Sequence, residues 1–418
     1  MCFTLIMKTK SHKHLLIAFI VLVILALGFF VLPQVVAKTY VADSIATLEK
    51  EEEDNNGGLF GKKEEEIVPE TPAYIADHIE TPEPLYGVYM TSWVAGTPSL
   101  RNAVVKLVDE TPINAIVLDI KDYSGKISFA MSDPLVNKYE STEKRIGDIK
   151  GLIEEWHAKG IYVIGRITVF QDPYLSKTHP EMAIKSVSTG DVWKDKNGLG
   201  YLYPGSENAW EYTLAIANEA YAIGFDEINF DYIRFPSDGN IKDMAIPASG
   251  KSKADIVESF FAYVHEHTKD TGLKTSADLF GMVTTNTDDL GIGQVLERAL
   301  PYFDYICPMV YPSHYPANFN GWANPNANPH DLIKYVMEAA VRRADAMHND
   351  PAQTDEVRDH VNKNQLRPWL QNFSLGQPPY TATEIHAQIQ GTYDAGLSSW
   401  ILWDASNKYN YTRAALTN

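Results

Sequence analysis

The chain has 418 residues, enough for a large hydrophobic core in one or two domains, and its apolar content of 45% is ordinary for a globular protein. The formal net charge of −18 argues against nucleic acid and anionic membrane surfaces as partners. The two cysteines, Cys2 and Cys307, exclude a framework of several disulfide bonds.

The first part of the chain has the pattern of an export signal. Residues 1–14 are basic, and an apolar run over residues 15–32 follows them. This run is close to the roughly 20 residues that span a bilayer, and it exceeds the core of about 7–15 residues typical of cleavable signals. We therefore predict a cytoplasmic n-region and a transmembrane signal-anchor helix over residues 15–37. The alternative is a signal cleaved after residues 35–37, and in both cases the rest of the chain is exported.

Residues 38–84 are acidic and rich in residues that break helices. Acidic runs at 51–54 and 64–66 are joined by the Asn-Gly stretch 55–58, and several prolines follow. Such a segment cannot bury enough apolar surface to fold. We predict a disordered acidic linker that holds the next domain away from the membrane.

From residue 85 to residue 418, short apolar runs alternate with stretches of helical period. The strand candidates are residues 85–92, 114–120, 161–168, 226–233, 274–279, 304–310, 366–372 and 398–403. The helix candidates are residues 146–156, 209–223, 252–267, 331–348 and 381–395. Glycines stand between a helical stretch and a strand, where a helix C-cap belongs, at positions 160, 224, 272 and 396.

Eight strands alternating with helices predict an α/β fold, a (β/α)8 TIM barrel over residues 85–418. The alternative is a doubly wound open sheet. Such a sheet would usually carry a glycine-rich phosphate-binding turn after its first strand. Residues 91–96 match that turn poorly.

The fourth predicted strand has an unusual alternation of side chains. Ile228 and Phe230 point to one face, because strand side chains alternate with a period of two. Glu227, Asn229 and Asp231 point to the other face. Three polar groups on the inner face of a central strand are costly unless they line a wet cavity. We interpret this strand as forming a site, and the alternative is an edge strand with one solvated face.

Two long connections follow predicted strands. Residues 169–208 and 311–330 both carry several aromatic residues. In a barrel these connections lie at the C-terminal end of the strands, where barrel enzymes have their active sites. Long loops in compact domains are often functional, and the alternative is that their aromatic residues only pack onto the rim.

Polar, ionisable and aromatic residues recur near the C-terminal end of strand after strand. The two that we predict to be catalytic are Asp231 and Asp278. Those that we predict to bind substrate are Asp119, Lys121, Asp122, Arg166, Asn229, Arg234, Tyr311, Gln371, Trp403 and Asp404. The alternative for each carboxylate is a structural ion pair in the barrel mouth.

Paired carboxyl groups suit hydrolysis of a glycosidic bond, because one protonates the leaving oxygen while the other attacks the anomeric carbon or activates water. Asp231 and Asp278 lie on neighbouring predicted strands. One carboxylate raises the pKa of the other, so the pair divides the two roles. We predict Asp231 as nucleophile or base and Asp278 as acid, with Arg166 holding Asp231 ionised or binding a substrate hydroxyl.

Other chemistries have weak signals in this sequence. There is no HExxH motif, and the histidines are scattered rather than clustered. The GxSxG nucleophile elbow and the P-loop are also missing. We therefore predict neither a metal site nor a cofactor.

Several stretches of the predicted barrel carry a family resemblance. They are residues 87–91, 114–122, 162–172, 231–236, 276–281 and 308–315. Through them residues 85–404 resemble the bacterial "putative glycosyl hydrolase" domain family, which is assigned to the TIM-barrel glycosidases. The resemblance implies a barrel related to the α-amylase-like and polygalactosaminidase-like glycosidases. In those relatives the carboxylate of strand four is commonly catalytic, which implies this role for Asp231.

The sequence therefore predicts an envelope-anchored glycoside hydrolase that acts on an extracellular or cell-wall polysaccharide. One alternative is a catalytically silent glycan-binding or scaffold protein, because a barrel fold does not dictate function. Another is a transglycosylase, which uses the same residues but excludes water.

Overall fold

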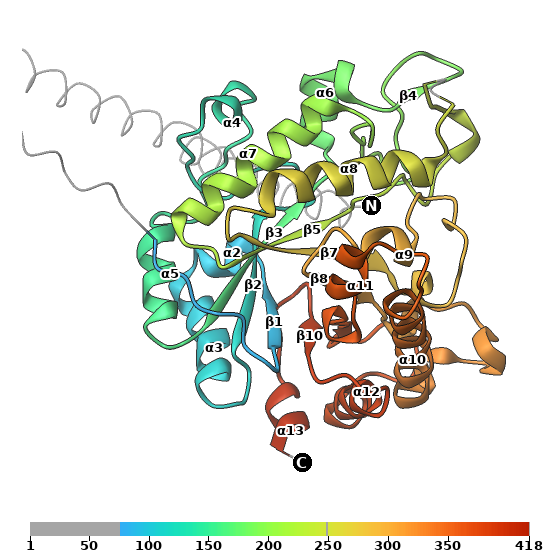
Figure 1. The fold of residues 1–418 in the computed structure, drawn as a ribbon. Coiled ribbons are helices and arrows are strands. Elements are labelled where there is room, and N and C mark those ends of the chain that lie inside the picture. The colour runs from blue at the N-terminus through green and yellow to red at the C-terminus, as the bar shows by residue number, and fades with distance from the viewer. Residues whose placement is uncertain (1–75, 248–249, 418) are drawn as a thin grey trace, which may run out of the picture. The chain divides into compact units, whose positions relative to one another are not determined.

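The computed structural model describes residues 76–247 and 250–417, which contain a closed barrel of parallel strands surrounded by helices (Figure 1). Around the barrel the order is β1-β10-β9-β8-β7-β5-β3-β2. The strands are β1 (Tyr86–Met90), β2 (Ala115–Lys121), β3 (Tyr162–Thr168), β5 (Glu227–Asp231), β7 (Lys274–Phe280), β8 (Tyr305–Met309), β9 (Trp369–Gln371) and β10 (Trp400–Trp403). All eight predicted strands and the (β/α)8 architecture are confirmed, and closure of the sheet excludes the doubly wound alternative.

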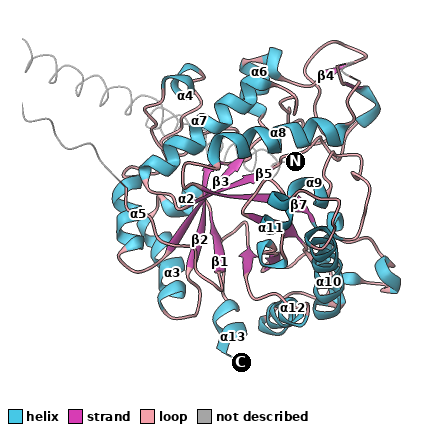
Figure 2. Ribbon diagram, in the orientation of Figure 1, coloured by secondary structure: helices cyan, strands magenta, loops and turns pink. Residues whose placement is uncertain are grey.

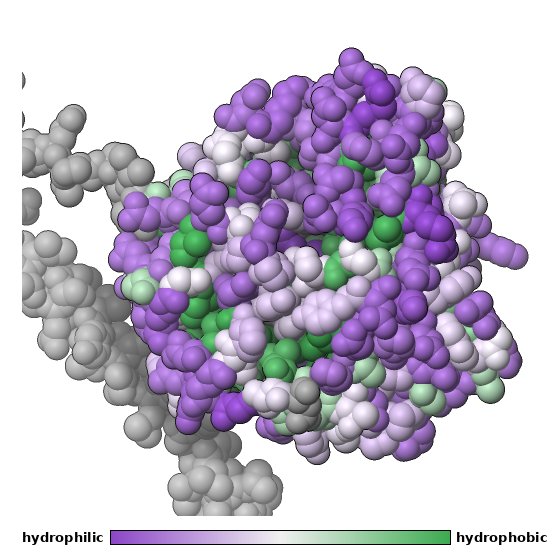
Figure 3. Space-filling view, turned by 60° about the horizontal axis from the view of Figure 1, so that its bottom comes forward, coloured by the Kyte–Doolittle hydropathy of each residue, from purple (hydrophilic) through white to green (hydrophobic). Residues whose placement is uncertain are grey.

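Helices form the outer layer of the barrel, as Figure 2 shows. They are α2 (Ser92–Ala95), α3 (Pro98–Asp109), α4 (Pro134–Lys138), α5 (Ile149–His157), α6 (Pro173–Thr178), α7 (Glu207–Ile223), α8 (Lys253–Thr268), α9 (Leu296–Ala299), α10 (Pro329–His348), α11 (Asp355–His360), α12 (Ala382–Asp394) and α13 (Thr412–Thr417). The five predicted helices correspond to α5, α7, α8, α10 and α12, whereas α3 between the first two strands was not predicted. On the face drawn in Figure 3, hydrophilic residues cover most of the surface and apolar residues appear mainly in recesses between them.

The two long connections contain short elements. In the first lie η1 (Pro180–Met182) and β4 (Lys185–Ser186), and β4 pairs antiparallel with β6 (Met244–Ala245) after η2 (Ile241–Asp243). The second contains η4 (Pro312–His314), η5 (Phe319–Gly321) and η6 (Pro325–Ala327). Two further 3-10 helices are η3 (Gly281–Thr284) and η7 (Lys363–Gln365).

Local sequence explains where the helices begin and end. The Ser252 side chain accepts a hydrogen bond from the Asp255 backbone, and Asp255 returns one to the Ser252 backbone, so a capping box opens α8. Gly224 caps α7 with a φ of 129°, a conformation that glycine adopts without steric cost. The other predicted cap glycines, at positions 160, 272 and 396, also have positive φ.

Strand β5 confirms the interpretation of its alternation. It pairs with β3 on one side and β7 on the other, so it is not an edge strand. The Phe230 ring packs outward against Phe260 of α8, with ring centroids 6.3 Å apart. Glu227, Asn229 and Asp231 are buried on the opposite face, inside the barrel.

A buried ion pair fills the N-terminal end of the barrel. Nη1 of Arg367 donates to both carboxylate oxygens of Glu227 at 3.0 and 3.1 Å. The Tyr162 hydroxyl donates to the same carboxylate at 3.2 Å, and the Arg367 guanidinium lies 3.6 Å from the centre of the Tyr305 ring. Both charged side chains are buried, so each depends on its partner.

Residues 76–84, in the region predicted to be linker, contact this end of the barrel. The backbone N–H of Ile79 donates to Asp226 at 2.7 Å, and Thr81 and Tyr162 hydroxyl oxygens lie 2.9 Å apart. The predicted anchor over residues 15–37 lies outside the described residues, as does the rest of the linker. Within residues 76–247 and 250–417, no helix combines the length and apolarity that crossing a membrane requires.

Arg367→Met should lower the free energy of unfolding by about 3–5 kcal/mol, because it leaves the Glu227 charge buried without a partner. Adding Glu227→Gln should recover part of that loss, since the second change removes the unpaired charge. Urea denaturation measures both effects. Arg342→Met, on the exposed side of α10, is the control and should change stability by less than about 0.5 kcal/mol. If Arg367→Met alone were as stable as the wild type, the Glu227–Arg367 pair would have no structural role.

Candidate active site

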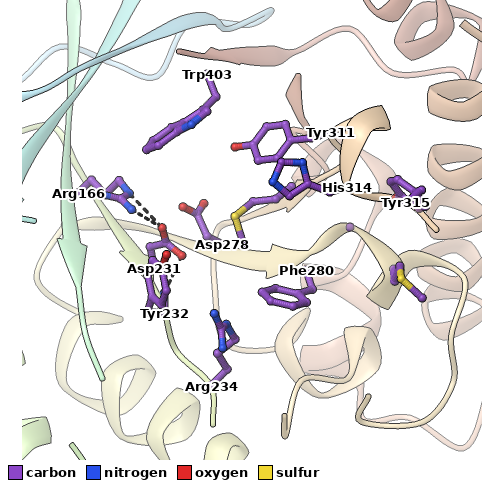
Figure 4. A pocket seen from close by; sticks show the side chains of 13 residues that line it. Arg166, Asp231, Tyr232, Arg234, Asp278, Phe280, Tyr311, His314, Tyr315 and Trp403 are labelled. Atoms are coloured by element: carbon purple, nitrogen blue, oxygen red, sulfur yellow. Dashed lines mark hydrogen bonds and ion pairs between the residues drawn. The ribbon is translucent and has the colours of Figure 1, made fainter. Parts of the chain in front are cut away.

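A pocket of about 380 Å³ lies at the C-terminal end of the barrel strands, and Figure 4 shows its side chains. Its lining combines two carboxyl groups, two guanidinium groups and several aromatic rings. The lining residues are Arg166, Asp231, Tyr232, Arg234, Asp278, Phe280, Gly281, Met282, Met309, Tyr311, His314, Tyr315 and Trp403.

Arg166 on β3 joins two carboxylates from neighbouring strands. Its Nη1 donates to Asp119 at 2.7 Å, and its Nε donates to Oδ2 of Asp231 at 3.1 Å while Nη2 contacts the same oxygen. The Tyr89 hydroxyl donates to the other oxygen of Asp119 at 2.5 Å. Burial raises the pKa of Asp119. Burial lowers the pKa of Arg166, but the charges of Asp231 and Asp119 together outweigh it and raise that pKa well above its usual value. Arg166 is therefore a fixed cation that orients Asp231.

Asp278 on β7 has a different environment. Its Oδ1 accepts hydrogen bonds from Asn229 Nδ2 at 2.9 Å and from Trp369 Nε1 at 2.7 Å. Burial, and then the charge of Asp231, raise the pKa of Asp278 well above its usual value. Asp278 is therefore disposed to hold a proton.

Strand register brings the two carboxyl groups together. The last paired residues of β5 and β7 are Phe230 and Ala277, and Asp231 and Asp278 each come next along their strands. Adjacent strands lie about 4.7–4.9 Å apart. Figure 4 shows both carboxyl groups directed into the same pocket, one paired with Arg166 and the other separate from it.

The backbone after Asp231 is in an unusual conformation. Tyr232 has a φ of 53°, a left-handed value that costs a bulky residue about 1–3 kcal/mol. Its backbone N–H donates to Oδ1 of Asp231 at 2.6 Å. The turn thus fixes the second oxygen of Asp231.

Aromatic rings form the remaining walls. Trp403 stacks on Tyr89 with ring centroids 3.9 Å apart, and its face also lies 5.1 Å from the Arg166 guanidinium. Tyr311 and His314 meet edge to face at 5.4 Å, and burial lowers the pKa of His314, which favours the neutral imidazole. Flat apolar faces beside polar groups are suited to sugar rings.

Half of the predicted site residues line this pocket. They are Arg166, Asp231, Arg234, Asp278, Tyr311 and Trp403. Asn229 and Asp119 lie just behind it, bonded to Asp278 and Arg166 respectively.

The other predicted residues support neighbouring structure. Lys121 forms a buried ion pair with Asp172 at 2.7 Å, because a register shift in β2 after Asp119 moves Lys121 off the inner face on which the sequence placed it. Asp122 pairs with Arg145 at 2.6 Å. Gln371 accepts from the Ser313 backbone at 3.1 Å, and Asp404 accepts from the Ser406 backbone at 2.8 Å. These side chains hold strand ends and loops beside the pocket.

Several lining residues were not predicted. Phe280 follows Asp278 by two residues, so extending the predicted strand 274–279 by one residue would have placed it on the same face. Gly281 is required by a close approach, because a Cβ there would lie 2.4 Å from the Met309 carbonyl oxygen. His314 lies in the stretch 308–315 that carries the family resemblance, but no alternation marks it as a lining residue. Among the residues that the structure describes, no group of three or more His, Cys, Asp or Glu side chains could hold a metal ion.

Comparisons with known proteins bear on the family and the fold of the chain. The model of the family described as "Putative glycosyl hydrolase domain" matches residues 87–409. A crystal structure of a hypothetical protein from Ruminiclostridium thermocellum is 36% identical and covers 49% of this chain and 98% of that chain, with a TM-score of 0.43. The PgaB (BpsB) glycoside hydrolase domain from Bordetella bronchiseptica is 14% identical over 80% of this chain and 98% of that chain, and its TM-score of 0.56 indicates a shared fold. A search of curated proteins finds no match.

Asp278→Asn should make the protein more stable than the wild type at pH 8 but not at pH 4. The folded protein raises the pKa of Asp278 above the unfolded value of about 3.9, so the free energy of unfolding falls as pH rises from that value toward the raised one. An amide cannot ionise and avoids this loss. Urea denaturation at the two pH values tests the difference.

Asp231→Asn is the matched comparison. It should lower stability at pH 8 by roughly 1.5–3 kcal/mol, because it weakens the charged hydrogen bonds with Arg166. If Asp278→Asn gave no gain at pH 8, the Asp278 carboxyl would have an ordinary pKa.

Proposed function

The chain belongs to the family described as "Putative glycosyl hydrolase domain", and on that premise we propose that it hydrolyses glycosidic bonds of a polysaccharide with Asp231 and Asp278. The observation that carries the proposal is the contrast between these two buried carboxyl groups. Asp231 pairs with Arg166, whereas the pKa of Asp278 is raised by burial and by the charge of Asp231. A glycosidase needs one ionised and one protonated carboxyl group at the scissile bond.

In the proposed reaction, Asp278 gives its proton to the glycosidic oxygen as the bond from that oxygen to the anomeric carbon breaks. Asp231 meets the positive charge that develops at the anomeric carbon, either as nucleophile or as base toward water. Water supplies a hydroxyl group to the anomeric carbon, and its remaining proton restores the acid. The products are two shorter glycans with one water molecule added between them.

The pocket walls support this role. Trp403 and Tyr311 offer aromatic faces beside the two carboxyl groups, and such faces stack on sugar rings. Asn229, which bonds to Asp278, and Tyr232, whose backbone bonds to Asp231, hold the reacting groups from behind. These contacts fix both carboxyl groups before substrate arrives.

The proposal also places the reaction outside the cytoplasm. Its support is the basic stretch 1–14 and the apolar run 15–32 in the sequence. The expected substrates are therefore extracellular or cell-wall polysaccharides.

Asp231→Asn and Asp278→Asn should each lower kcat/KM by about 10²–10⁴-fold, measured as reducing-end release from bacterial exopolysaccharides and glucans. On an aryl glycoside whose leaving group needs no proton, Asp278→Asn should regain most activity and Asp231→Asn should not. Asp109→Asn, at the exposed end of α3, is the control. Glycan binding without turnover, unaffected by Asp231→Asn, would favour a binding protein instead.

Trp369→Phe should move the alkaline limb of the pH–activity profile to higher pH. The indole N–H stabilises the ionised form of Asp278, so its removal raises the pKa of that carboxyl group further. Activity requires the protonated acid and is lost as pH rises through this pKa, so a higher pKa preserves it longer. Trp400→Phe removes an indole N–H that donates to Tyr393 and should leave the limb in place. A limb that stays fixed in Trp369→Phe would argue against Asp278 as the acid.

A further inference from the structure

We infer that the pocket takes a glycan bearing a carboxylate, and that Arg234 binds this group. The inference rests on the proposed function, because it names the substrate class of the same pocket. The observation that carries the inference is the buried guanidinium of Arg234. It lines the pocket and forms an ion pair with no carboxylate of residues 76–247 and 250–417.

Arg234 differs from the other buried arginines of the described chain. Arg166 pairs with Asp119 and Asp231, and Arg367 pairs with Glu227. Arg234 is only 6% exposed, yet its sole hydrogen bond among the described residues runs from Nη1 to the backbone carbonyl of Phe235 at 3.0 Å. A buried charge without a counterion is costly, so a position that keeps one indicates a partner that arrives from outside.

The Arg234 guanidinium is held in place by two aromatic rings. Its central carbon lies 4.4 Å from the centre of the Phe280 ring and 4.9 Å from that of Tyr232. Together with the Nη1 hydrogen bond, these contacts fix the plane of the group. Little side-chain freedom is left to lose when a ligand binds.

The free edge of Arg234 suits a carboxylate. Its Nε and Nη2 form no hydrogen bond with the described residues, and the side chain lines the pocket. Arg166 uses this same pair of atoms to hold Asp231. Two parallel N–H groups match the two oxygens of a carboxylate.

The pocket's own carboxyl groups do not compensate Arg234. Asp231 is engaged by Arg166, and Asp278 accepts from Asn229 and Trp369. In Figure 4, Arg234 and Trp403 lie on opposite sides of these two carboxyl groups. A sugar stacked on Trp403 at the reaction centre would therefore have its chain neighbour, or its own acidic substituent, beside Arg234. This arrangement selects uronic acids or similar carboxylated sugars.

The test uses the full chain and pairs of polysaccharides that differ only in charge. Polygalacturonate, alginate and hyaluronan are each compared with the same polymer after its carboxyl groups have been reduced to alcohols. Binding and reducing-end release are measured for each. For at least one pair, the wild type should prefer the native polymer by roughly 10- to 100-fold, the range expected for a charged hydrogen bond.

Arg234→Gln should lower binding of the native polymer, and reducing-end release from it, to the levels measured for the reduced polymer. Binding and release with the reduced polymer should stay unchanged. Arg234→Lys keeps the charge but loses the two parallel N–H groups, so it should retain part of the preference for the native polymer. It serves as the second variant if Arg234→Gln does not fold. Arg342→Gln removes the same charge from the surface of α10 and should keep the full preference. Dextran sulfate is compared with dextran in the same way. If this were the only pair to show a preference that depends on Arg234, the carboxylate assignment would be overturned.

The outcomes separate this inference from the proposed hydrolysis. Carboxylate-dependent binding that Arg234→Gln abolishes, without cleavage, supports the inference and counts against the hydrolase. Cleavage of neutral glycans that Arg234→Gln leaves unchanged supports the hydrolase and overturns the inference. The inference is also overturned if the wild type binds and cleaves the native and reduced forms of every polymer equally well.

Discussion

Closure of the barrel buries the inner face of β5, and that face carries three polar side chains. Each must find its partner on another strand, because a buried polar group without one is costly. Glu227 pairs with Arg367, two residues before β9, while Asn229 bonds to Asp278 of β7 and Asp231 pairs with Arg166 of β3. A single strand thus ties together much of the barrel interior, and the need to satisfy its polar groups fixes the relative positions of the others.

The same requirement produces the contrast in the pocket. At the N-terminal end the charge on β5 is matched one to one and makes an interior contact away from the pocket. At the C-terminal end the Arg166 guanidinium pairs with both Asp231 and Asp119. The hydrogen bonds to Asp278 come from the neutral donors of Asn229 and Trp369. Burial, and then the charge of Asp231, raise the pKa of Asp278, while Asp231 keeps the direct contact with Arg166.

The fold could be predicted because it depends on patterns that the sequence displays locally. Short apolar runs between helical stretches identified every barrel strand, and period-two alternation placed Asp231 and Asp278 on the inner face at one end. This alternation was reliable only where the strands are regular. It failed where the backbone departs from regular geometry. The register shift in β2 turned Lys121 away, and the left-handed turn at Tyr232 gave no advance signal. The position of His314 depends on how a long loop packs, which no short-range pattern records.

The barrel interior beneath the pocket is filled. Asn229 and Ser276 are buried two residues before Asp231 and Asp278 on their strands, and the Glu227–Arg367 pair lies nearer the N-terminal end. Such an interior is a packed core rather than a channel. In the proposed reaction a glycan would therefore not thread through the molecule, and substrate and products would enter and leave at the C-terminal end of the barrel. On the proposed function, a product that leaves slowly would occupy the pocket that the next glycan needs, and would inhibit by occupancy alone.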